Sequence, residues 1–359
     1  MRIVLATPLY PPEPGGPATY AKLVEDELPK RGIAIEVVKF RDVRHLPPLI
    51  RHIAYGMRLY RATKGADLLF VQDTVSCGLP ALLVASLRHI PLVVRVPGDY
   101  VWEQSVQRFG VTSGIDAFQK EKGPWQSVLL RSIQNRVVRS ARTVIVPSEY
   151  FAKLVAGWGV PASKIVVVYH GISLPEALPH IVRPAGRLVV SSGRLVPWKG
   201  FRELIECIAR MPEWTLAIIG DGPDRSALES VAHSLGVTDR VIFVGKLPRS
   251  EALAWCKAAD AFVLNTAFES FSFQVAEAMA LGTPVVATNA GSLPEVLHSP
   301  EEGILVAPGD LVAIQEALGT VVTQPEEWKR RTQAAVEKAR TFSVERMLSA
   351  TVTALSRNV

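Results

Sequence analysis

Short runs of β-branched and other apolar residues alternate with longer amphipathic segments along the whole chain. This alternation is typical of strand–helix–strand units whose strands pair into parallel sheets. In the first half the pattern predicts six strands, over residues 2–7, 33–39, 68–71, 92–96, 143–147 and 165–169. In the second half it predicts six more, over residues 187–192, 215–220, 241–244, 261–264, 284–287 and 303–306. The predicted fold class is therefore α/β, with two doubly wound parallel sheets.

A Pro-punctuated segment over residues 173–186 separates the two series and has no periodicity, which is typical of a linker. We therefore expect an N-terminal domain over 1–172 and a C-terminal domain over 187–342. Residues 343–359 are expected to form a last helix that packs back on the N-terminal domain. Because open α/β sheets bind ligands at the carboxyl ends of their strands, we expect the two domains to face a cleft that holds the site.

The composition indicates a globular protein and argues against membrane-spanning and secreted classes. The chain has 359 residues, of which 48% are apolar and 21% charged, as in globular domains. The longest run without charged residues, 278–294, is interrupted by Gly and Pro and is too short to span a bilayer. Residues 3–6 are too short for the apolar part of a signal peptide. Three widely spaced cysteines argue against a disulfide framework or a zinc site, so a cytoplasmic protein is expected.

Positive charge is concentrated in the first half, where residues 1–170 hold 22 Lys and Arg against 13 Asp and Glu. Two amphipathic segments there, 49–62 and 125–142, are predicted to be helices that bury an apolar face and present arginines to the outside. In the first segment the predicted buried positions are Leu49, Ile53, Met57 and Tyr60, and in the second they are Leu129, Ile133 and Val137. Such basic faces either contact an anionic membrane peripherally or are simply solvated. No nucleic-acid partner is expected, because no aromatic residues interleave the charge.

The segment that follows the predicted strand 261–264 carries two carboxylates eight residues apart, Glu269 and Glu277. Glu269 lies in a loop at the strand's end, and Glu277 lies in a helix that is predicted to start near Ser272. The main-chain N–H groups around Phe273 and Gln274, with Ser272 or Ser270 as the cap, would bind a phosphate. The alternative is that the two carboxylates are a solvated residue and an ordinary helix residue.

Two further motifs also follow predicted strands. Residues 193–200 read Gly-Arg-Leu-Val-Pro-Trp-Lys-Gly, and a Gly15-Gly16 pair lies after the first strand. Together with the two glutamates, these motifs resemble those of the retaining nucleotide-sugar glycosyltransferases of family 4, which adopt the two-domain GT-B fold. The resemblance covers nearly the whole chain and is strongest over residues 187–310.

The resemblance implies roles for several residues. Arg194 and Lys199 would hold the diphosphate of a nucleotide sugar, where fixed positive charge stabilises the leaving group. Glu277 would accept hydrogen bonds from the ribose hydroxyls, and Glu269 would position the donor sugar or stabilise the transition state. The donor-binding set is Gly15, Gly16, Arg194, Lys199, Glu269, Ser272, Phe273 and Glu277. The alternatives are that Arg194 and Lys199 are surface residues and that Gly15-Gly16 is a simple turn.

One loop departs from the family pattern. Many relatives have a histidine after the fourth strand, but residues 95–103 contain none. Asp99 is the nearest polar replacement, as a group that binds a sugar hydroxyl or takes the acceptor's proton, and Glu103 is a second candidate. The alternative for Asp99 is a cap of the following helix. His170, at the end of the last strand of the first half, is expected to form an interdomain hydrogen bond rather than to catalyse.

The sequence thus predicts an enzyme, a retaining hexosyltransferase that uses a nucleoside-diphosphate sugar and a saccharide or lipid-linked acceptor, as in polysaccharide or glycolipid synthesis. The predicted catalytic residues are Glu269, Asp99, Arg194 and Lys199. No Asp-x-Asp pair occurs, so we expect no metal, and no cofactor is implied. The alternatives are a non-catalytic protein that binds sugar or nucleotide, and a sugar-nucleotide epimerase of the same fold.

Overall fold

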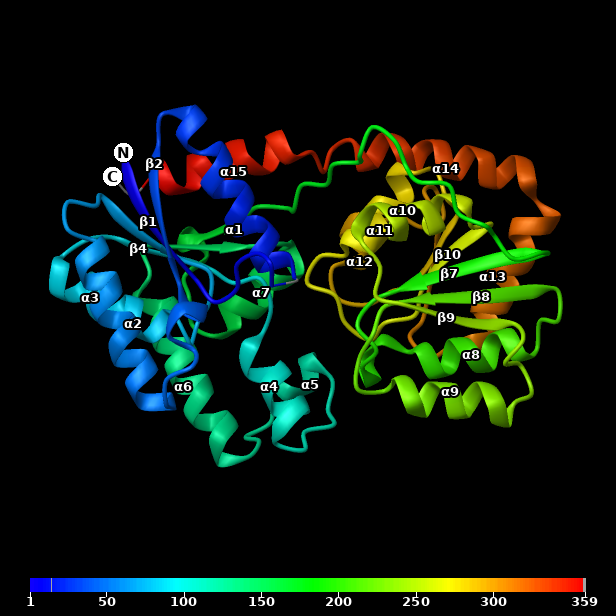
Figure 1. Cartoon of the computed structure of the whole chain (residues 1–359), viewed down its shortest axis with the longest axis horizontal. Coiled ribbons are helices and arrows are strands. Elements are labelled where there is room, and N and C mark those ends of the chain that lie inside the picture. Colours follow the sequence, from blue (N-terminus) through cyan, green and yellow to red (C-terminus); the bar gives the residue numbers. More distant parts are fainter. Residues whose placement is uncertain (14, 358–359) are drawn as a thin grey trace. The chain divides into compact units, whose positions relative to one another are not determined.

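A computed structural model of the chain describes residues 1–13 and 15–357. Pro14, which belongs to the Gly-rich loop of the first half, lies outside the described residues, as do residues 358 and 359. The chain forms two compact units (Figure 1). Unit 1 comprises residues 1–169 and 345–359, and unit 2 comprises residues 170–344. Residues 170–186, which include the predicted linker, are counted with unit 2.

Unit 1 contains a parallel sheet of six strands in the order β2-β1-β3-β4-β5-β6. Its strands are β1 (Arg2–Thr7), β2 (Ala34–Lys39), β3 (Leu68–Val71), β4 (Leu92–Arg95), β5 (Thr143–Val146) and β6 (Ile165–Val167). Every residue of β3 and β4 is buried, and β5 is buried as well, because helices cover both faces of the sheet. The continuous apolar runs of the sequence predicted these strands, and all six are confirmed.

The helices of unit 1 come from two parts of the chain, the N-terminal half and the C-terminal segment. They are α1 (Gly16–Glu27), α2 (Pro48–Ala62), α3 (Gly78–Arg88), α4 (Tyr100–Arg108), α5 (Ile115–Phe118), α6 (Trp125–Ser140), α7 (Glu149–Gly157) and α15 (Val344–Ser356). Short 3-10 turns cover Pro29–Arg31, Phe40–Val43 and Ala162–Lys164. Helix α15 packs against α1, where the buried hydroxyls of Tyr20 and Thr351 are 3.0 Å apart.

Unit 2 contains a second parallel sheet of six strands, in the order β12-β11-β10-β7-β8-β9. Its strands are β7 (Arg187–Ser192), β8 (Trp214–Ile219), β9 (Val241–Gly245), β10 (Ala261–Leu264), β11 (Val285–Thr288) and β12 (Ile304–Val306). Its helices are α8 (Phe201–Ala209), α9 (Arg225–Ser234), α10 (Arg249–Ala258), α11 (Phe273–Ala280), α12 (Leu293–Val296), α13 (Leu311–Thr323) and α14 (Pro325–Ala339), with a 3-10 turn, η4, over Pro197–Lys199. The predicted strands of this half are all confirmed, and so is the prediction of two doubly wound sheets.

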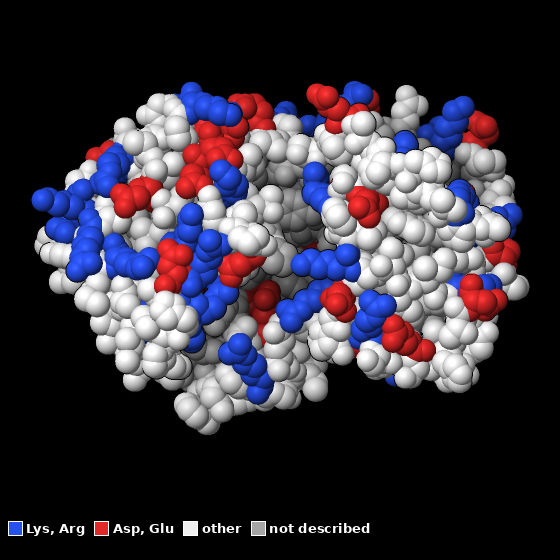
Figure 2. Space-filling view, viewed as in Figure 1, with Lys and Arg blue, Asp and Glu red and all other residues white. Residues whose placement is uncertain are grey.

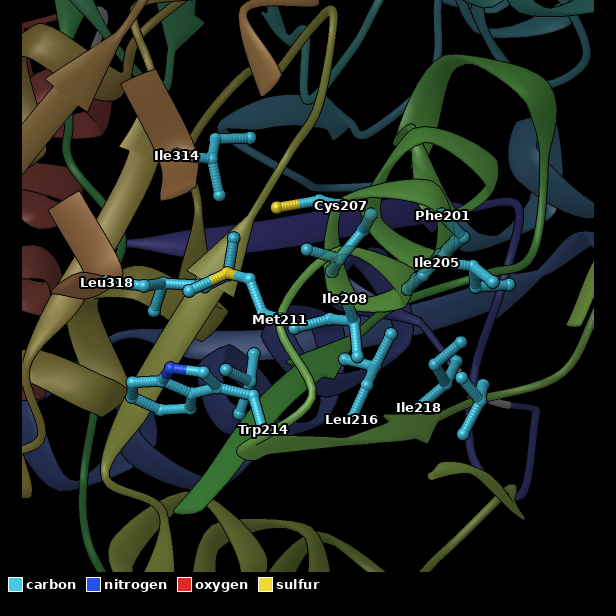
Figure 3. Packing of buried hydrophobic residues seen from close by; sticks show 14 of the residues in the cluster. Phe201, Ile205, Cys207, Ile208, Met211, Trp214, Leu216, Ile218, Ile314 and Leu318 are labelled. Atoms are coloured by element: carbon cyan, nitrogen blue, oxygen red, sulfur yellow. The ribbon is translucent and has the colours of Figure 1, made fainter. Parts of the chain in front are cut away.

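The core of unit 2 fixes the elements that carry the site loops. Trp214 at the start of β8 is fully buried and packs with Met211, Ile208 and Leu318, so that α8 and α13 are held on one face of the sheet (Figure 3). Burying one large apolar side chain contributes about 1.5–3 kcal/mol. The loop between β7 and α8 is therefore anchored at both ends by buried residues.

The buried faces of two helices differ from the prediction. Leu49, Ile53 and Met57 of α2, expected in the core, are 81%, 64% and 53% exposed. The helix buries the neighbouring strip of Tyr55, Leu59 and Ala62 instead. In α6, Leu129 is 54% exposed and Val137 is buried. The prediction was wrong because α2 carries apolar side chains on two adjoining strips, and only one strip meets the rest of the unit.

Candidate functional site

Two loops of unit 2 meet beside the point where the strand order reverses. Strand β7 pairs with β8 on one side and with β10 on the other, so the loops that follow β7 and β10 leave the sheet on either side of this point. Such switch points form crevices at the carboxyl ends of strands in open α/β sheets. Lys199 lies in the first loop and Glu269 in the second, and their side chains form a largely buried ion pair, 13% and 9% exposed. The structure therefore brings together two of the predicted site residues.

Main-chain contacts hold this pair in place. The side-chain amide of Asn265 donates to the carbonyl of Gly200 at 2.9 Å, and Ala267 N–H donates to the carbonyl of Trp198 at 2.8 Å. Gly200 has φ of 60°, and a Cβ there would lie 2.1 Å from the carbonyl oxygen of Asn265. Only glycine therefore allows the two loops to approach this closely.

The β11 loop supports Glu269 from the other side. Ser292 N–H donates to the Glu269 carbonyl at 3.0 Å. Gly291 has φ of 57°, and a Cβ there would lie 2.3 Å from the same carbonyl oxygen. The main chain at Glu269 is thus fixed on both sides, which preorganises its carboxylate.

Arg194 lies on the surface of the loop that follows β7. Main-chain hydrogen bonds from Gly193 to Ile219 and from Leu195 to Asp221, 2.9 and 3.1 Å long, tie this loop to the one after β8. Within the part of the chain that the structure describes, no carboxylate lies within ion-pair distance of the Arg194 guanidinium. An exposed, uncompensated guanidinium on an anchored loop can bind an anion.

Helix α11 begins directly after Glu269's loop. The hydroxyl of its cap, Ser272, accepts from Val275 N–H at 3.3 Å. The main-chain N–H groups of Phe273 and Gln274 have no acceptor among the described residues, which leaves two donors at the positive end of the helix. The Phe273 ring packs 4.6 Å from the ring of His170. Phe273 can therefore offer its N–H group, while its side chain is part of an aromatic cluster.

Glu277 has a partner that the sequence analysis missed. Arg249 donates through Nε and Nη2 to the same carboxylate oxygen at 2.9 and 2.6 Å, and it also donates to the Ser173 carbonyl at 2.6 Å. Burial raises the pKa of Glu277, and Arg249 partly opposes that shift. Arg249 is the first residue of α10, directly after the β9 loop. Its position just past the end of a parallel strand was the signal that could have identified it.

The remaining predicted residues belong to unit 1. Gly15 and Gly16 start α1, with Gly15 exposed at φ of 130°. Asp99 is buried and caps α4, accepting from the N–H groups of Val101 and Trp102 at 3.1 and 3.2 Å. The side-chain amides of Gln119 and Gln134 also donate to its carboxylate, at 2.9 and 3.2 Å. The capping alternative therefore describes this residue, because its oxygens are occupied by protein donors.

Glu103, the second candidate, lies in the wall of a pocket. It is half-buried on α4 and lines a pocket of about 590 Å³ together with Gly98, Tyr100 and Arg108. The pocket lies at the carboxyl ends of β1, β3 and β4, where a doubly wound sheet binds ligands. Across the described residues, no group of three or more His, Cys, Asp or Glu side chains is arranged to hold a metal ion.

Comparison with known proteins identifies the family. A family model described as glycosyl transferases group 1 matches residues 181–338, and a glycosyl transferase 4-like domain matches residues 2–171. This chain belongs to the group 1 glycosyltransferases. The family resemblance that the sequence motifs indicated is therefore confirmed.

Curated relatives and solved structures agree with this assignment. A 2-deoxystreptamine N-acetyl-D-glucosaminyltransferase of Streptomyces fradiae is 33% identical over 46% of this chain and 42% of its own length. Glycogen synthase of Mycobacterium tuberculosis is 30% identical over 72% of this chain and 61% of its own length. The chain thus spans less than two thirds of these relatives.

Solved glycosyltransferase structures share the fold over almost the whole chain. Sucrose-phosphate synthase from Thermosynechococcus elongatus superimposes with a TM-score of 0.80 at 19% identity, covering 99% of this chain and 98% of that protein. HepE of Anabaena, solved with UDP-glucose, gives 0.78 at 19% identity, covering 99% and 100%. The GT-B fold is therefore confirmed for this glycosyltransferase.

Proposed function

We propose that this glycosyltransferase moves a hexose from a nucleoside-diphosphate sugar to a saccharide or lipid-linked acceptor, with retention of anomeric configuration and without a metal ion. The observation that carries the proposal is the Lys199–Glu269 pair at the switch point of unit 2, next to the free N–H groups of α11. A cation, a helix N-terminus and a carboxylate at one strand end suit a ligand with an anionic diphosphate and a polyhydroxylated sugar. UDP-glucose is the first donor to test, since HepE of Anabaena is solved with it.

In this proposal, Arg194 and Lys199 hold the diphosphate. Negative charge on the leaving diphosphate grows as the anomeric C–O bond breaks, so fixed cations beside it lower the barrier. Lys199 is already in place because Glu269 and the loop after β10 hold it, so little reorganisation is needed during the reaction. The N–H groups of Phe273 and Gln274 supply further donors for phosphate oxygens.

The two glutamates have different tasks in the proposed mechanism. Glu277 accepts hydrogen bonds from the ribose diol, and Arg249 orients its carboxylate and opposes the rise in its pKa that burial causes. Glu269 accepts from hydroxyls of the donor sugar. Its pairing with Lys199 favours positioning over nucleophilic attack, because a cation lowers the nucleophilicity of the carboxylate. The departing phosphate then takes the proton of the acceptor hydroxyl as it attacks the same face of the sugar.

On the acceptor side, the proposal assigns Glu103 rather than Asp99 to contact with the incoming hydroxyl. Glu103 lines the pocket of unit 1, whereas the oxygens of Asp99 are held by four N–H donors. Gly15 and Gly16 allow a ligand to approach the main chain at the start of α1. We also propose that the protein works in the cytoplasm and meets the membrane through α2 and its neighbours, in line with their arginines.

The test is an assay of nucleoside diphosphate released from UDP-glucose and from other nucleotide sugars, with and without added acceptor. We expect release with at least one donor, stimulation by acceptor, and no loss of rate with a chelator. Sugar or nucleotide binding without release from any donor would favour the alternative of a non-catalytic binding protein. Strong inhibition by a chelator would contradict the metal-independent part of the proposal.

A further inference from the structure

Helices α2 and α3 of unit 1 leave an apolar groove open on the surface. Their side chains line a groove of about 640 Å³, and its lining includes Ile53, Met57 and Tyr60 from α2 and Leu83 and Leu87 from α3. Leu83 and Leu87 are 58% and 70% exposed. The two helices pack side by side in Figure 1, so these residues form one continuous apolar surface. A contiguous apolar patch on a soluble domain marks a binding surface.

The same two helices carry only positive charge. Arg51, Arg58 and Arg61 lie on α2 and Arg88 ends α3, and neither helix contains Asp or Glu. The guanidinium of Arg88 stacks on the Tyr60 ring at 3.6 Å, and Arg61 lines the groove. Lys and Arg side chains are numerous on the face of unit 1 shown in Figure 2. An apolar groove with a cationic rim matches an anionic amphiphile.

The pocket that contains Glu103 adjoins the groove. Arg51 lines the pocket and the next residue, His52, lines the groove. On the facing segment, Ser76 lines the pocket and Leu79 the groove, and His52 Nδ1 lies 3.2 Å from the Ser76 carbonyl oxygen. The two cavities therefore share a boundary at His52 and Ser76.

The pocket presents cations that the protein does not neutralise. Arg51 and Arg108 line it, and neither has a carboxylate within ion-pair distance among residues 1–13 and 15–357. The Nε atom of Arg51 is buried without a hydrogen-bond partner. A third arginine, Arg44, pairs with Glu13. A buried guanidinium nitrogen without an acceptor is costly unless a ligand supplies one.

Two carboxylates, Asp73 and Glu103, also line the pocket, and neither forms an ion pair with Arg51 or Arg108. Asp73 is buried and accepts from the N–H groups of Val75 and Cys77 at 3.1 and 2.6 Å, and burial raises its pKa. Glu103 lies on α4, which also carries Arg108. Arg51 and Arg108, which form no ion pair with a described residue, can thus bind an anion in the pocket.

We propose that unit 1 binds an anionic lipid, with its phosphate on Arg51 and Arg108 and its hydrocarbon chain in the groove between α2 and α3. This inference rests on the proposed function in one respect, since it makes the acceptor a phosphate-bearing lipid rather than a free saccharide. It joins two independent observations, an apolar groove and an arginine pocket, through their shared boundary at His52 and Ser76.

The experiment compares sedimentation of the protein with vesicles of phosphatidylcholine and with vesicles that also contain phosphatidylglycerol. We expect binding to the anionic vesicles only, weakened by salt. Arg51→Gln with Arg108→Gln should lower the partition coefficient about thirtyfold, since each arginine near the surface is worth about fivefold. Leu83→Gln with Leu87→Gln should lower it at least about tenfold. Glycerol phosphate, which lacks the chain, should compete weakly.

Matched controls come from unit 2. Val312 is 57% exposed and Arg330 has a side chain 80% exposed, so Val312→Gln and Arg330→Gln remove one apolar group and one charge elsewhere. Both controls should leave vesicle binding unchanged. The two double variants change four residues that are exposed or half-buried, and the melting temperatures of these proteins establish that they are folded. Absence of vesicle binding, equal binding to both vesicle types, or unchanged binding in either double variant would overturn the inference.

Nucleotide binding separates this inference from the proposed function. UDP binding is measured by calorimetry on the same preparation. Vesicle binding without any nucleotide binding or release would refute the glycosyltransferase mechanism and leave the lipid site standing. Release of UDP with a neutral, water-soluble saccharide acceptor, unaffected by the Leu83 and Leu87 changes, would support the enzyme and overturn the lipid acceptor.

Discussion

The loop after the fourth strand of each unit carries an acidic residue, and the two carboxylates have different partners. Asp99 follows β4 in unit 1, and Glu269 follows β10 in unit 2. Both are buried, with 1% and 7% of their surface exposed. Asp99 accepts hydrogen bonds from two main-chain and two amide donors, whereas Glu269 pairs with the cation Lys199. An acidic residue that follows a parallel strand therefore caps a helix in unit 1 and pairs with a lysine in unit 2.

The difference comes from what each neighbourhood supplies. Neutral N–H donors that belong to the fold hold Asp99, whose Oδ1 accepts from three of them and whose Oδ2 accepts from one, so most of its acceptor capacity is used within unit 1. A lysine at the end of a flexible stem can share its three donors between a carboxylate and a phosphate. The position of an acidic residue at a strand end is thus insufficient evidence of catalysis, and its partners decide the role.

Removal of the cations of unit 2 should have the largest effect. Arg194→Ala and Lys199→Ala together should reduce turnover to background, because each lost preorganised group costs about 2–4 kcal/mol of barrier. The measurement is nucleotide release from UDP-glucose, with circular dichroism to confirm the fold. Lys199→Ala with Glu269→Gln avoids leaving a buried charge unpaired and should be equally inactive.

The control for this pair of cations is Arg202→Ala, since Arg202 is an exposed cation on α8, three residues after Lys199. It should keep the rate of the original protein. Turnover within about threefold of that rate in the Arg194→Ala, Lys199→Ala protein would remove both cations from the mechanism.

The second test breaks the pair of Glu277 with Arg249. Arg249→Gln and Glu277→Gln should each weaken UDP-glucose binding about tenfold, one by leaving a buried carboxylate unpaired and the other by removing the acceptor for the ribose. The double variant should lose less than the sum, by about 1 kcal/mol or more. Calorimetric titration measures all three proteins.

Arg225→Gln serves as the reference for these variants, because Arg225 pairs with Glu229 on α9 outside the proposed contacts. Additive losses in the double variant would show that Arg249 does not act through Glu277.

A smaller effect should appear in the pH dependence of donor binding. Burial raises the pKa of Glu277, and the ionised carboxylate is the form that accepts from ribose hydroxyls. Affinity for UDP-glucose should therefore be present above that pKa and be lost over the acidic range in which Glu277 takes up its proton, a range that burial moves upward from that of an ordinary glutamate. The diphosphate of UDP-glucose stays ionised over this range, so the protein is the titrating partner. Glu277→Gln should bind weakly with no such slope, and an unchanged slope in that variant would assign the titration to another group.

Asp99 should give the smallest change in turnover. Asp99→Ala removes the cap of α4 and should lower the free energy of unfolding by about 1–2 kcal/mol. Turnover per folded molecule should stay within about twofold of the original, because the proposed mechanism gives this carboxylate no contact with substrate. Ser148→Ala, which removes the cap of α7 in the same unit, should cause the loss of a cap alone, without the further cost of the Gln119 and Gln134 amides that Asp99→Ala leaves without this acceptor. A large loss of turnover in Asp99→Ala but not in Ser148→Ala would show that Asp99 takes part in catalysis, as Glu269 is proposed to do.

Most of the unit 2 site could be predicted from the sequence. The motif over 193–200 and Glu269 lie in the loops that follow β7 and β10, and Glu277 lies in the helix after the second loop, so their place near the carboxyl ends of the sheet depends only on local pattern and topology. Arg249 could not be paired with Glu277 in this way, because the two residues lie on different helices, α10 and α11. The exposed apolar strip of α2 was wrongly predicted to be buried. Both apolar strips of this helix have helical spacing, so the sequence does not show which of them packs against the rest of the unit.

By itself the sequence determined the twelve strands, the two doubly wound sheets and the residues at their carboxyl ends, because periodicity and turn residues act over a few neighbouring positions. Only the tertiary structure decided which charged groups pair and which apolar faces stay open. In the folded structure Asp99 accepts hydrogen bonds from the amides of Gln119 and Gln134. Glu269 forms an ion pair with Lys199, and Ile53 is exposed to solvent. These pairings and exposures depend on side chains that are distant in the sequence and close in the fold, so the spacing of residues along the chain does not predict them.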